Sequence, residues 1–325
     1  MAAMRWLSLF GFLGWFVSCP AFADNYPSRV ITVIVPYPAG GPTDLVARLV
    51  TNIMSKEIGQ QFIVENVGGA SGTIGASRVA RATADGYTLL MHNITFAVAP
   101  ALYKSRTYDP LKDFDPIGLV AETPQAIVSK NTLAANDLNE LISFIKKDQK
   151  RINLADAGRG SGSYLCNLFF ANAINASMTA VSYRGTGPAL NDLLAGQVDL
   201  MCDQVANTGA QIKAGNIRAY CVTSRARLHM LPTTPTCEEA GLKQLETSVW
   251  VAFLGPRGIP KEVVAKLAPA LKNALHDPTV VKRMVEFATT PAADEVATPD
   301  GLSAFLKSEV DKWSQTLTTM KISAE

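Results

Sequence analysis

Apolar residues along this chain fall into two patterns, short β-branched runs and longer stripes with helical spacing. The first run, at residues 31–35, ends in Pro36, and a helical stripe over residues 43–58 follows after a short loop. Strands at 61–65 and 87–91 enclose a second loop and a second helical stripe. Two rounds of strand, loop and helix predict an α/β fold with a parallel sheet.

The rest of the chain continues this alternation. A break at Glu122-Thr123-Pro124 separates two apolar runs, and Gly255-Pro256 ends another. We therefore expect further strands at 117–121, 126–128, 152–155, 179–183, 198–202, 217–223 and 249–254, and helices at 136–148, at 164–173, before Gly196, from Pro260 and at 299–317.

Small-residue loops lie between several of these strands and helices. They cover residues 36–42, 66–73, 158–163 and 184–188, and Pro42 in the first of them favours a first helical turn that Thr43 or Asp44 can cap. In a parallel sheet, such loops meet beside the carboxyl ends of the strands. Free backbone N–H groups and helix dipoles favour a carboxylate or a phosphate there. A capped turn without a ligand is the alternative interpretation.

Length and charge narrow the class of protein. A chain of 325 residues is long enough for two domains, and 48% hydrophobic residues supply a sizeable core. The formal net charge is only +2, and no run of lysine and arginine is longer than two residues, as at Lys146-Lys147. Because nucleic-acid and membrane-surface binding need clustered positive charge, we expect neither.

The first 23 residues are typical of a secretory signal peptide. Arg5 precedes the apolar run 6–17, and Ala21-Phe22-Ala23 offers a cleavage site after Ala23. The run is too short to span a membrane, so we expect an exported protein. Cys19 offers a lipoprotein site as the alternative end of this segment.

Four cysteines follow this segment, at positions 166, 202, 221 and 237. None forms a C-x-x-C pair and the three histidines are scattered, so we expect no metal site and no cofactor. An exported protein can form disulfides, and Cys202 and Cys221 both fall in predicted buried strands. We prefer to interpret these cysteines as small buried apolar residues, and leave a Cys202–Cys221 bond open.

Three motifs that are common in nucleotide-binding proteins and hydrolases are missing from the sequence. Gly158-x-Gly160 and Gly185-x-Gly187 lack the third glycine of a dinucleotide loop, and neither a P-loop nor a G-x-S-x-G turn occurs. His92 ends a predicted strand, where it is better suited to line or cap a pocket than to act as a general base. The sequence therefore does not support an enzyme.

Four blocks of sequence resemble a known family. They are V-I-V-P-Y-P-A-G-G-P-T-D at 33–44, V-E-N-V-G-G-A-S-G-T-I-G at 64–75, A-D-G-Y-T-L-L at 84–90 and Y-R-G-T-G-P-A-L-N-D-L-L-A-G-Q-V-D-L-M-C-D at 183–203. In this order, and behind an export signal, they are similar to the tripartite tricarboxylate transporter substrate-binding proteins, also called Bug-type extracytoplasmic solute receptors.

The resemblance implies a type II periplasmic binding-protein fold, in which two α/β lobes enclose a ligand cleft. Crossovers near Thr123 and Ser224 would divide the chain into lobe 1 (residues 24–123 and 224–325) and lobe 2 (residues 124–223). It also implies a periplasmic protein that captures a small carboxylate, such as a di- or tricarboxylate or an aromatic acid. We expect a monomer that delivers this solute to a two-component membrane permease.

The resemblance also implies a set of ligand contacts. Ala39 and Gly40 would donate backbone N–H groups. Asp44 would cap a helix and orient the loop, whereas Asp203 would either do the same or meet a donor of the ligand or a bridging water. This sequence departs from the family pattern at Arg159 and at Tyr164, where a histidine is common, which leaves the distal ligand group undefined. The implied ligand-binding residues are Tyr37, Ala39, Gly40, Thr43, Ala70, Ser71, His92, Asn93, Ser161, Ser163, Tyr183 and Asp203.

Two other functions stand as alternatives. One is a secreted α/β enzyme acting on an acyl or phosphoryl substrate, which turnover of a candidate acid would reveal. The other is a ligand-sensing partner of a membrane kinase. It would be revealed if deletion of the protein abolished gene induction but not uptake.

Overall fold

The computed structural model describes residues 26–103, 106–243 and 245–322 of the 325-residue chain. The predicted signal peptide, its cleavage after Ala23 and the lipoprotein alternative at Cys19 lie outside these residues. No helix in the described part of the chain is long and apolar enough to cross a membrane.

The first part of the chain forms three parallel strands, each followed by a helix. These elements are β1 (Ile31–Val35), α1 (Pro42–Ile58), β2 (Phe62–Asn66), the short 3-10 helix η2 (Ala70–Gly72), α2 (Thr73–Ala80), β3 (Thr88–Asn93) and α3 (Thr95–Leu102). Residues of β1 and β3 are almost all buried on both faces, as is typical of strands covered by helices on two sides. The loops after β1 and β2 are the small-residue segments that the sequence placed before helices.

Two long antiparallel strands, β4 (Phe114–Lys130) and β9 (Ser248–Pro256), join the two halves of the molecule. The prediction of two separate strands around residues 122–124 is wrong, because β4 is continuous. Pro124 is tolerated since it lies where β4 changes partners, pairing with β9 up to Pro124 and with another strand from Gln125 onward. Pro256 also belongs to β9, at the strand end.

The middle of the chain adds a second group of strands at the far end of β4. Its elements are α4 (Leu138–Lys147), the 3-10 helix η3 (Gln149–Arg151), β5 (Asn153–Asp156), α5 (Gly162–Ala173), β6 (Thr179–Ser182), α6 (Thr186–Leu194), β7 (Leu200–Gln204), α7 (Val205–Lys213) and β8 (Ile217–Val222). Strands β6, β5 and β7 are parallel to one another. Strands β7 and β8 pair antiparallel with the two edges of β4.

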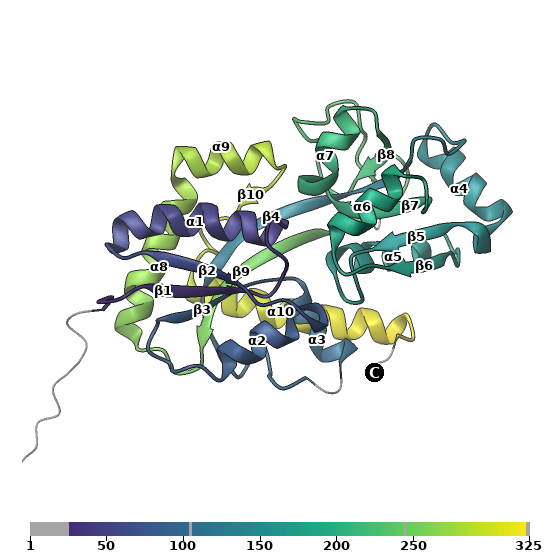
Figure 1. Cartoon of the computed structure of the whole chain (residues 1–325). Helices are drawn as coiled ribbons and strands as arrows, with labels where there is room; N and C mark the ends of the chain where they lie inside the picture. The colour runs from purple at the N-terminus through teal and green to yellow at the C-terminus, as the bar shows by residue number, and fades with distance from the viewer. Residues whose placement is uncertain (1–25, 104–105, 244, 323–325) are drawn as a thin grey trace, which may run out of the picture.

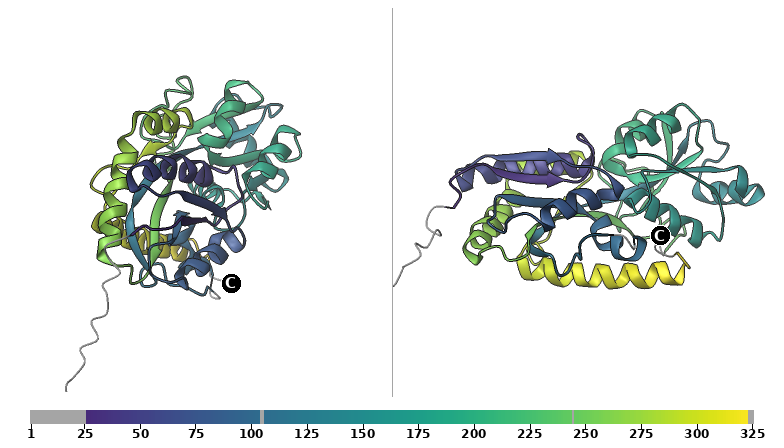
Figure 2. Two further views of the ribbon diagram at one scale, coloured as in Figure 1. Left: turned by 60° about the vertical axis from the view of Figure 1, so that its left-hand side comes forward. Right: turned by 60° about the horizontal axis from the view of Figure 1, so that its bottom comes forward.

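The last quarter of the chain returns to the first group of strands, β1–β3. It forms α8 (Lys261–His276), α9 (Pro278–Glu286), β10 (Thr290–Pro291) and α10 (Pro299–Thr319). Helix α10 extends beyond the first group and runs beside the second (Figure 2). There Trp313 packs against Phe169 of α5, with 5.3 Å between the ring centroids.

The strands of the described residues form one mixed ten-stranded sheet in the order β2-β1-β3-β9-β4-β7-β5-β6, with β8 and β10 paired to β4. One group of elements surrounds β1–β3 and another surrounds β5–β8, and β4 and β9 pass between them (Figure 1). The α/β prediction is confirmed. The parallel arrangement holds within each group but not for β4 and β9, which run antiparallel to their neighbours.

Two disulfides bond the four cysteines of the described chain, Cys166 with Cys202 and Cys221 with Cys237. Our preferred interpretation of these cysteines as free buried residues is therefore wrong, and the Cys202–Cys221 bond does not form. Cys202 on β7 and Cys221 on β8 both lie opposite Ile127, on the two edges of β4. They are thus separated by two strand spacings of about 4.8 Å each, which is too far for a disulfide.

Candidate functional site

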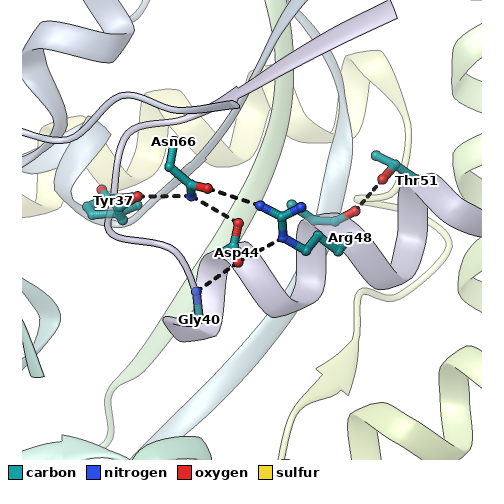
Figure 3. A network of polar contacts seen from close by, with 7 residues as sticks. Tyr37, Gly40, Asp44, Arg48, Thr51 and Asn66 are labelled. Carbon is teal, nitrogen blue, oxygen red and sulfur yellow. Dashed lines mark hydrogen bonds and ion pairs between the residues drawn. The ribbon is translucent and has the colours of Figure 1, made fainter. Parts of the chain in front are cut away.

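The loop between β1 and α1 is held in shape by the buried carboxylate of Asp44. This carboxylate accepts hydrogen bonds from the Gly40 N–H (2.9 Å), from Arg48 Nε (3.0 Å) and from Asn66 Nδ2 (2.9 Å) (Figure 3). Gly41 is the N-cap residue of α1 and, among the described residues, no side chain caps it. The prediction that Thr43 or Asp44 caps this helix is therefore wrong, and Asp44 orients the loop through its three hydrogen bonds instead.

The charge of Asp44 follows from these contacts. Burial alone would raise the pKa of Asp44, but the hydrogen bonds from Arg48, Gly40 and Asn66 outweigh it and lower the pKa, so the carboxyl is ionised at neutral pH. The Gly40 N–H is used by the protein itself in this structure, whereas the sequence assigned it to a ligand. The neighbouring Ala39 is exposed, and its N–H has no partner among the described residues.

The loop between β2 and α2 has a strained backbone. Residues 69–72 all have positive φ, from +45° at Ala70 to +126° at Gly69. Residues with a Cβ rarely adopt this region, so Ala70 and Ser71 each carry a cost of about 1–3 kcal/mol. Such strain persists only where the surroundings fix it. Here Ser71 Oγ donates a hydrogen bond to the carbonyl of Arg159, in the second group of strands.

The two groups of strands meet at these loops. Tyr103 Oη, just beyond α3, lies 2.7 Å from the Arg159 carbonyl oxygen and 2.9 Å from Ser71 Oγ. Gly185, in the loop after β6, lies close to Pro38 in the loop after β1, since a Cβ built on Gly185 would be 3.9 Å from Pro38 Cγ. The loops after β1 and β2 thus face the loops after β5 and β6, at the carboxyl ends of parallel strands, where ligands bind in open α/β sheets.

A buried polar cluster supports the first loop from beneath. Tyr37 Oη donates to Asn93 Oδ1 (2.6 Å), lies 3.0 Å from His92 Nδ1 and contacts Thr95 Oγ1. Asn93 Nδ2 donates to Thr43 Oγ1 (3.3 Å). Burial lowers the pKa of His92 to about 3, so its ring is neutral. His92 and Asn93 therefore position Tyr37 and Thr43 in this structure.

The predicted hydroxyls of the second group have partners within the protein. Ser161 is the N-cap residue of α5, and its Oγ accepts the backbone N–H three residues on (3.1 Å). Ser163 Oγ donates to the carbonyl of Cys202 (2.5 Å). Tyr183 Oη donates to Asp192 Oδ2 (2.6 Å), which raises the pKa of Tyr183 to about 12. Ser163 and Tyr183 thus fix α5 and α6 in place.

Asp203 is buried at the end of β7, and within the described residues its partners are Gln204, Asn207 and Thr186 rather than a lysine or an arginine. Oδ1 accepts the Gln204 N–H (2.7 Å), and Asn207 Nδ2 lies 3.4 Å from Oδ2. Burial outweighs these bonds and the one from Thr186, and raises the pKa of Asp203 to about 6. A carboxyl that titrates near neutral pH can either accept or donate a hydrogen bond.

Three supporting residues were not predicted from the sequence: Asn66, Asp156 and Tyr103. Asp156 accepts hydrogen bonds from the Gly158 N–H (2.7 Å) and Ser182 Oγ (2.9 Å), and so shapes the loops after β5 and β6. Asn66 and Asp156 each end a strand just before a glycine-containing loop, a signal that could have identified both. Tyr103 carries no such signal, because its partner is 56 residues away along the chain.

Other parts of the surface offer weaker candidates. No group of three or more His, Cys, Asp or Glu side chains is arranged to hold a metal within the described ranges. Two pockets of about 380 Å³ lie apart from the facing loops. Asp137, Tyr220 and Glu239 line one of them, and Leu111 and Lys307 the other. The predicted ligand residues gather at the facing loops instead, which makes those loops the candidate site.

Comparison with known proteins identifies a family. Residues 46–321 match the family described as "Tripartite tricarboxylate transporter family receptor". A relative from Agrobacterium vitis, the UPF0065 protein in the TAR-I ttuE-ttuC' intergenic region, is 44% identical over 294 residues, covering 90% of this chain and 85% of the relative. The match therefore extends over both groups of strands.

Two solved structures have the same fold. The periplasmic binding protein BugD is 41% identical, with a TM-score of 0.87 over 92% of this chain and 100% of BugD. MatC from Rhodopseudomonas palustris, solved with bound malate, is 37% identical, with a TM-score of 0.84 over 89% of this chain and 99% of MatC. The predicted fold class and resemblance are confirmed, and the family is one of receptors rather than enzymes. The chain belongs to the tripartite tricarboxylate transporter family of receptors.

Proposed function

We propose that this protein is a periplasmic receptor that captures a small carboxylate and delivers it, as a monomer, to a membrane permease. Its family, its similarity to the periplasmic binding protein BugD and the malate bound to MatC support this proposal. The observation that carries it is the meeting of loops from both groups of strands. These loops bring helix N-termini together, where a carboxylate is favoured.

The proposed receptor has two lobes, residues 24–123 with 224–325 and residues 124–223. The change of partners of β4 at Pro124 and the end of β8 at Val222 support these boundaries. A ligand that contacts both lobes shifts the balance between open and closed forms by its differential affinity for them. Closure would thus signal occupancy to the permease.

Within this proposal, the candidate residues divide into two roles. The exposed backbone N–H groups of Ala39 and Ala70 lack partners among the described residues, and they contact the ligand together with Ser161 and Asp203. The remaining residues position the loops through the hydrogen bonds described above. They are Tyr37, Gly40, Thr43, Ser71, His92, Asn93, Ser163 and Tyr183.

A thermal-shift screen tests the ligand class. Malate and succinate would be compared with malamide and succinamide, which keep the shape and lose the charge. An acid that binds the folded protein should raise the melting temperature, by a stabilisation of about 2.7 kcal/mol at one hundred times its Kd. Stabilisation by the amides and by neither acid would contradict the proposal.

A charge variant tests the location. Ala39→Glu places a negative charge beside the first loop and should weaken acid binding about tenfold or more, a change of about 1.4 kcal/mol. Ala304→Glu, at an exposed position of α10, is the matched control and should not weaken it. Equal affinities of the two variants would place the site elsewhere. In a deletion strain, loss of gene induction with unchanged uptake would favour the sensing alternative.

A further inference from the structure

Two buried glutamines lie side by side beneath the start of α5. Gln125 of β4 and Gln204 of β7 are partners in the antiparallel ladder, so their side chains point to the same face of the sheet with Cβ atoms about 5 Å apart. Gln125 is 1% exposed and Gln204 is 8% exposed. Among the described residues, neither amide nitrogen Nε2 has a hydrogen-bond partner.

The face that they share is the one covered by α5. Cys202, two residues before Gln204 on β7, points to the same face and is bonded to Cys166 of α5. Gln125 Nε2 reaches the first residue of this helix, since a Cβ built on Gly162 would lie 3.7 Å from it. Helix α5 has 12 residues, so its N-terminus carries the positive end of a substantial dipole.

The chemistry of these groups defines what would complement them. A buried donor without a partner is costly and rarely kept in native proteins without a reason. An amide nitrogen only donates, so its complement is an acceptor oxygen. Two adjacent donors beside a helix N-terminus favour an acceptor that carries negative charge. A carboxylate, with its two oxygens, meets both conditions.

The start of α5, which Gln125 reaches, follows directly on one of the facing loops. Arg159, three residues before Gly162, receives hydrogen bonds on its carbonyl from Ser71 and Tyr103 of the first group. We propose that Gln125, Gln204 and the N-terminus of α5 form a subsite for the second carboxylate of the ligand, and that they select dicarboxylates over monocarboxylates. This proposal rests on the function proposed above.

Matched pairs of acids test it. L-2-hydroxybutyrate is L-malate with the distal carboxylate replaced by methyl, and butyrate stands in the same relation to succinate. Calorimetric titrations would compare the wild type with Gln125→Leu, Gln204→Leu and the control Gln197→Leu, which changes an exposed glutamine of the same group. We expect each of the first two variants to lose about tenfold or more in dicarboxylate affinity and to keep monocarboxylate affinity within about twofold. The control should match the wild type.

The other outcomes are distinguishable. Melting temperatures report whether the variants fold, and Gln125→Met provides a more flexible replacement should leucine not be accommodated. Equal losses for both members of a pair, or unchanged affinity for the dicarboxylate, would make the glutamines structural and overturn this proposal alone. This proposal would also be overturned if the wild type bound each dicarboxylate and its matched monocarboxylate with equal affinity. No binding of any of the four acids would overturn the proposed function and this subsite together.

Discussion

Replacing Asp44 by alanine tests whether one carboxylate holds the first loop. Asp44 is 2% exposed and accepts hydrogen bonds from Gly40, Arg48 and Asn66. A hydrogen bond to a charged group contributes about 1.5–3 kcal/mol. Gly40 and Arg48 are exposed, so water can accept their hydrogen bonds in place of Asp44. Asn66 is half-buried and less accessible to water. We therefore expect Asp44→Ala to lower the free energy of unfolding by about 2–3 kcal/mol.

The same carboxylate makes stability depend on pH. Burial opposes ionisation of Asp44, yet its hydrogen bonds hold its pKa below the ordinary value of 3.8. A carboxyl whose pKa is lower in the folded state stabilises the fold above its unfolded pKa, and this stabilisation is lost as pH falls through the folded pKa. The difference between wild type and Asp44→Ala should thus be complete at pH 7 and shrink as the pH falls below about 4.

Urea unfolding followed by circular dichroism measures both effects. Asp311→Ala is the control, because Asp311 is exposed and pairs with Lys307 one helical turn away, so its loss should change stability little. Two results would refute the reasoning. One is a loss at pH 7 no larger than that of the control, and the other is a difference that stays constant down to pH 3.

Three further variants probe other contacts. Cys166→Ser combined with Cys202→Ser should lower the free energy of unfolding by about 2–4 kcal/mol, because the bond closes a loop of 36 residues; urea unfolding that is insensitive to the change would show that the bond does not stabilise the protein. Tyr103→Phe removes the hydrogen bond to the Arg159 carbonyl and should speed amide hydrogen exchange in the loop after β5 by up to about tenfold. Unchanged exchange would show that Tyr103 does not hold this loop in place. Gly118→Ala should cost about 1–3 kcal/mol, because the added Cβ would lie 2.9 Å from a backbone atom of the loop before α10, and an unchanged melting temperature would contradict that packing.

Local patterns in the sequence were sufficient for much of the fold. The stripe of α1 and its end at Gly59, which adopts φ +75°, follow from helical spacing and from the freedom of glycine, and both are confirmed. Helix α3 was missed because its residues are apolar on every side and nearly all buried, so no stripe distinguishes them. The break predicted at 122–124 failed because the effect of a proline depends on which strand lies beside it.

The sequence by itself determined the α/β alternation, the loops that form the candidate site and the family, since each rests on residues close together along the chain. The tertiary structure alone decided which backbone donors in those loops already have a partner within the protein. The Gly40 N–H, for example, donates to Asp44. It also decided that Cys202 pairs with Cys166, and that Gln125 faces Gln204. These outcomes depend on the order of strands around β4, which brings together residues whose separation along the chain carries no information about their contact.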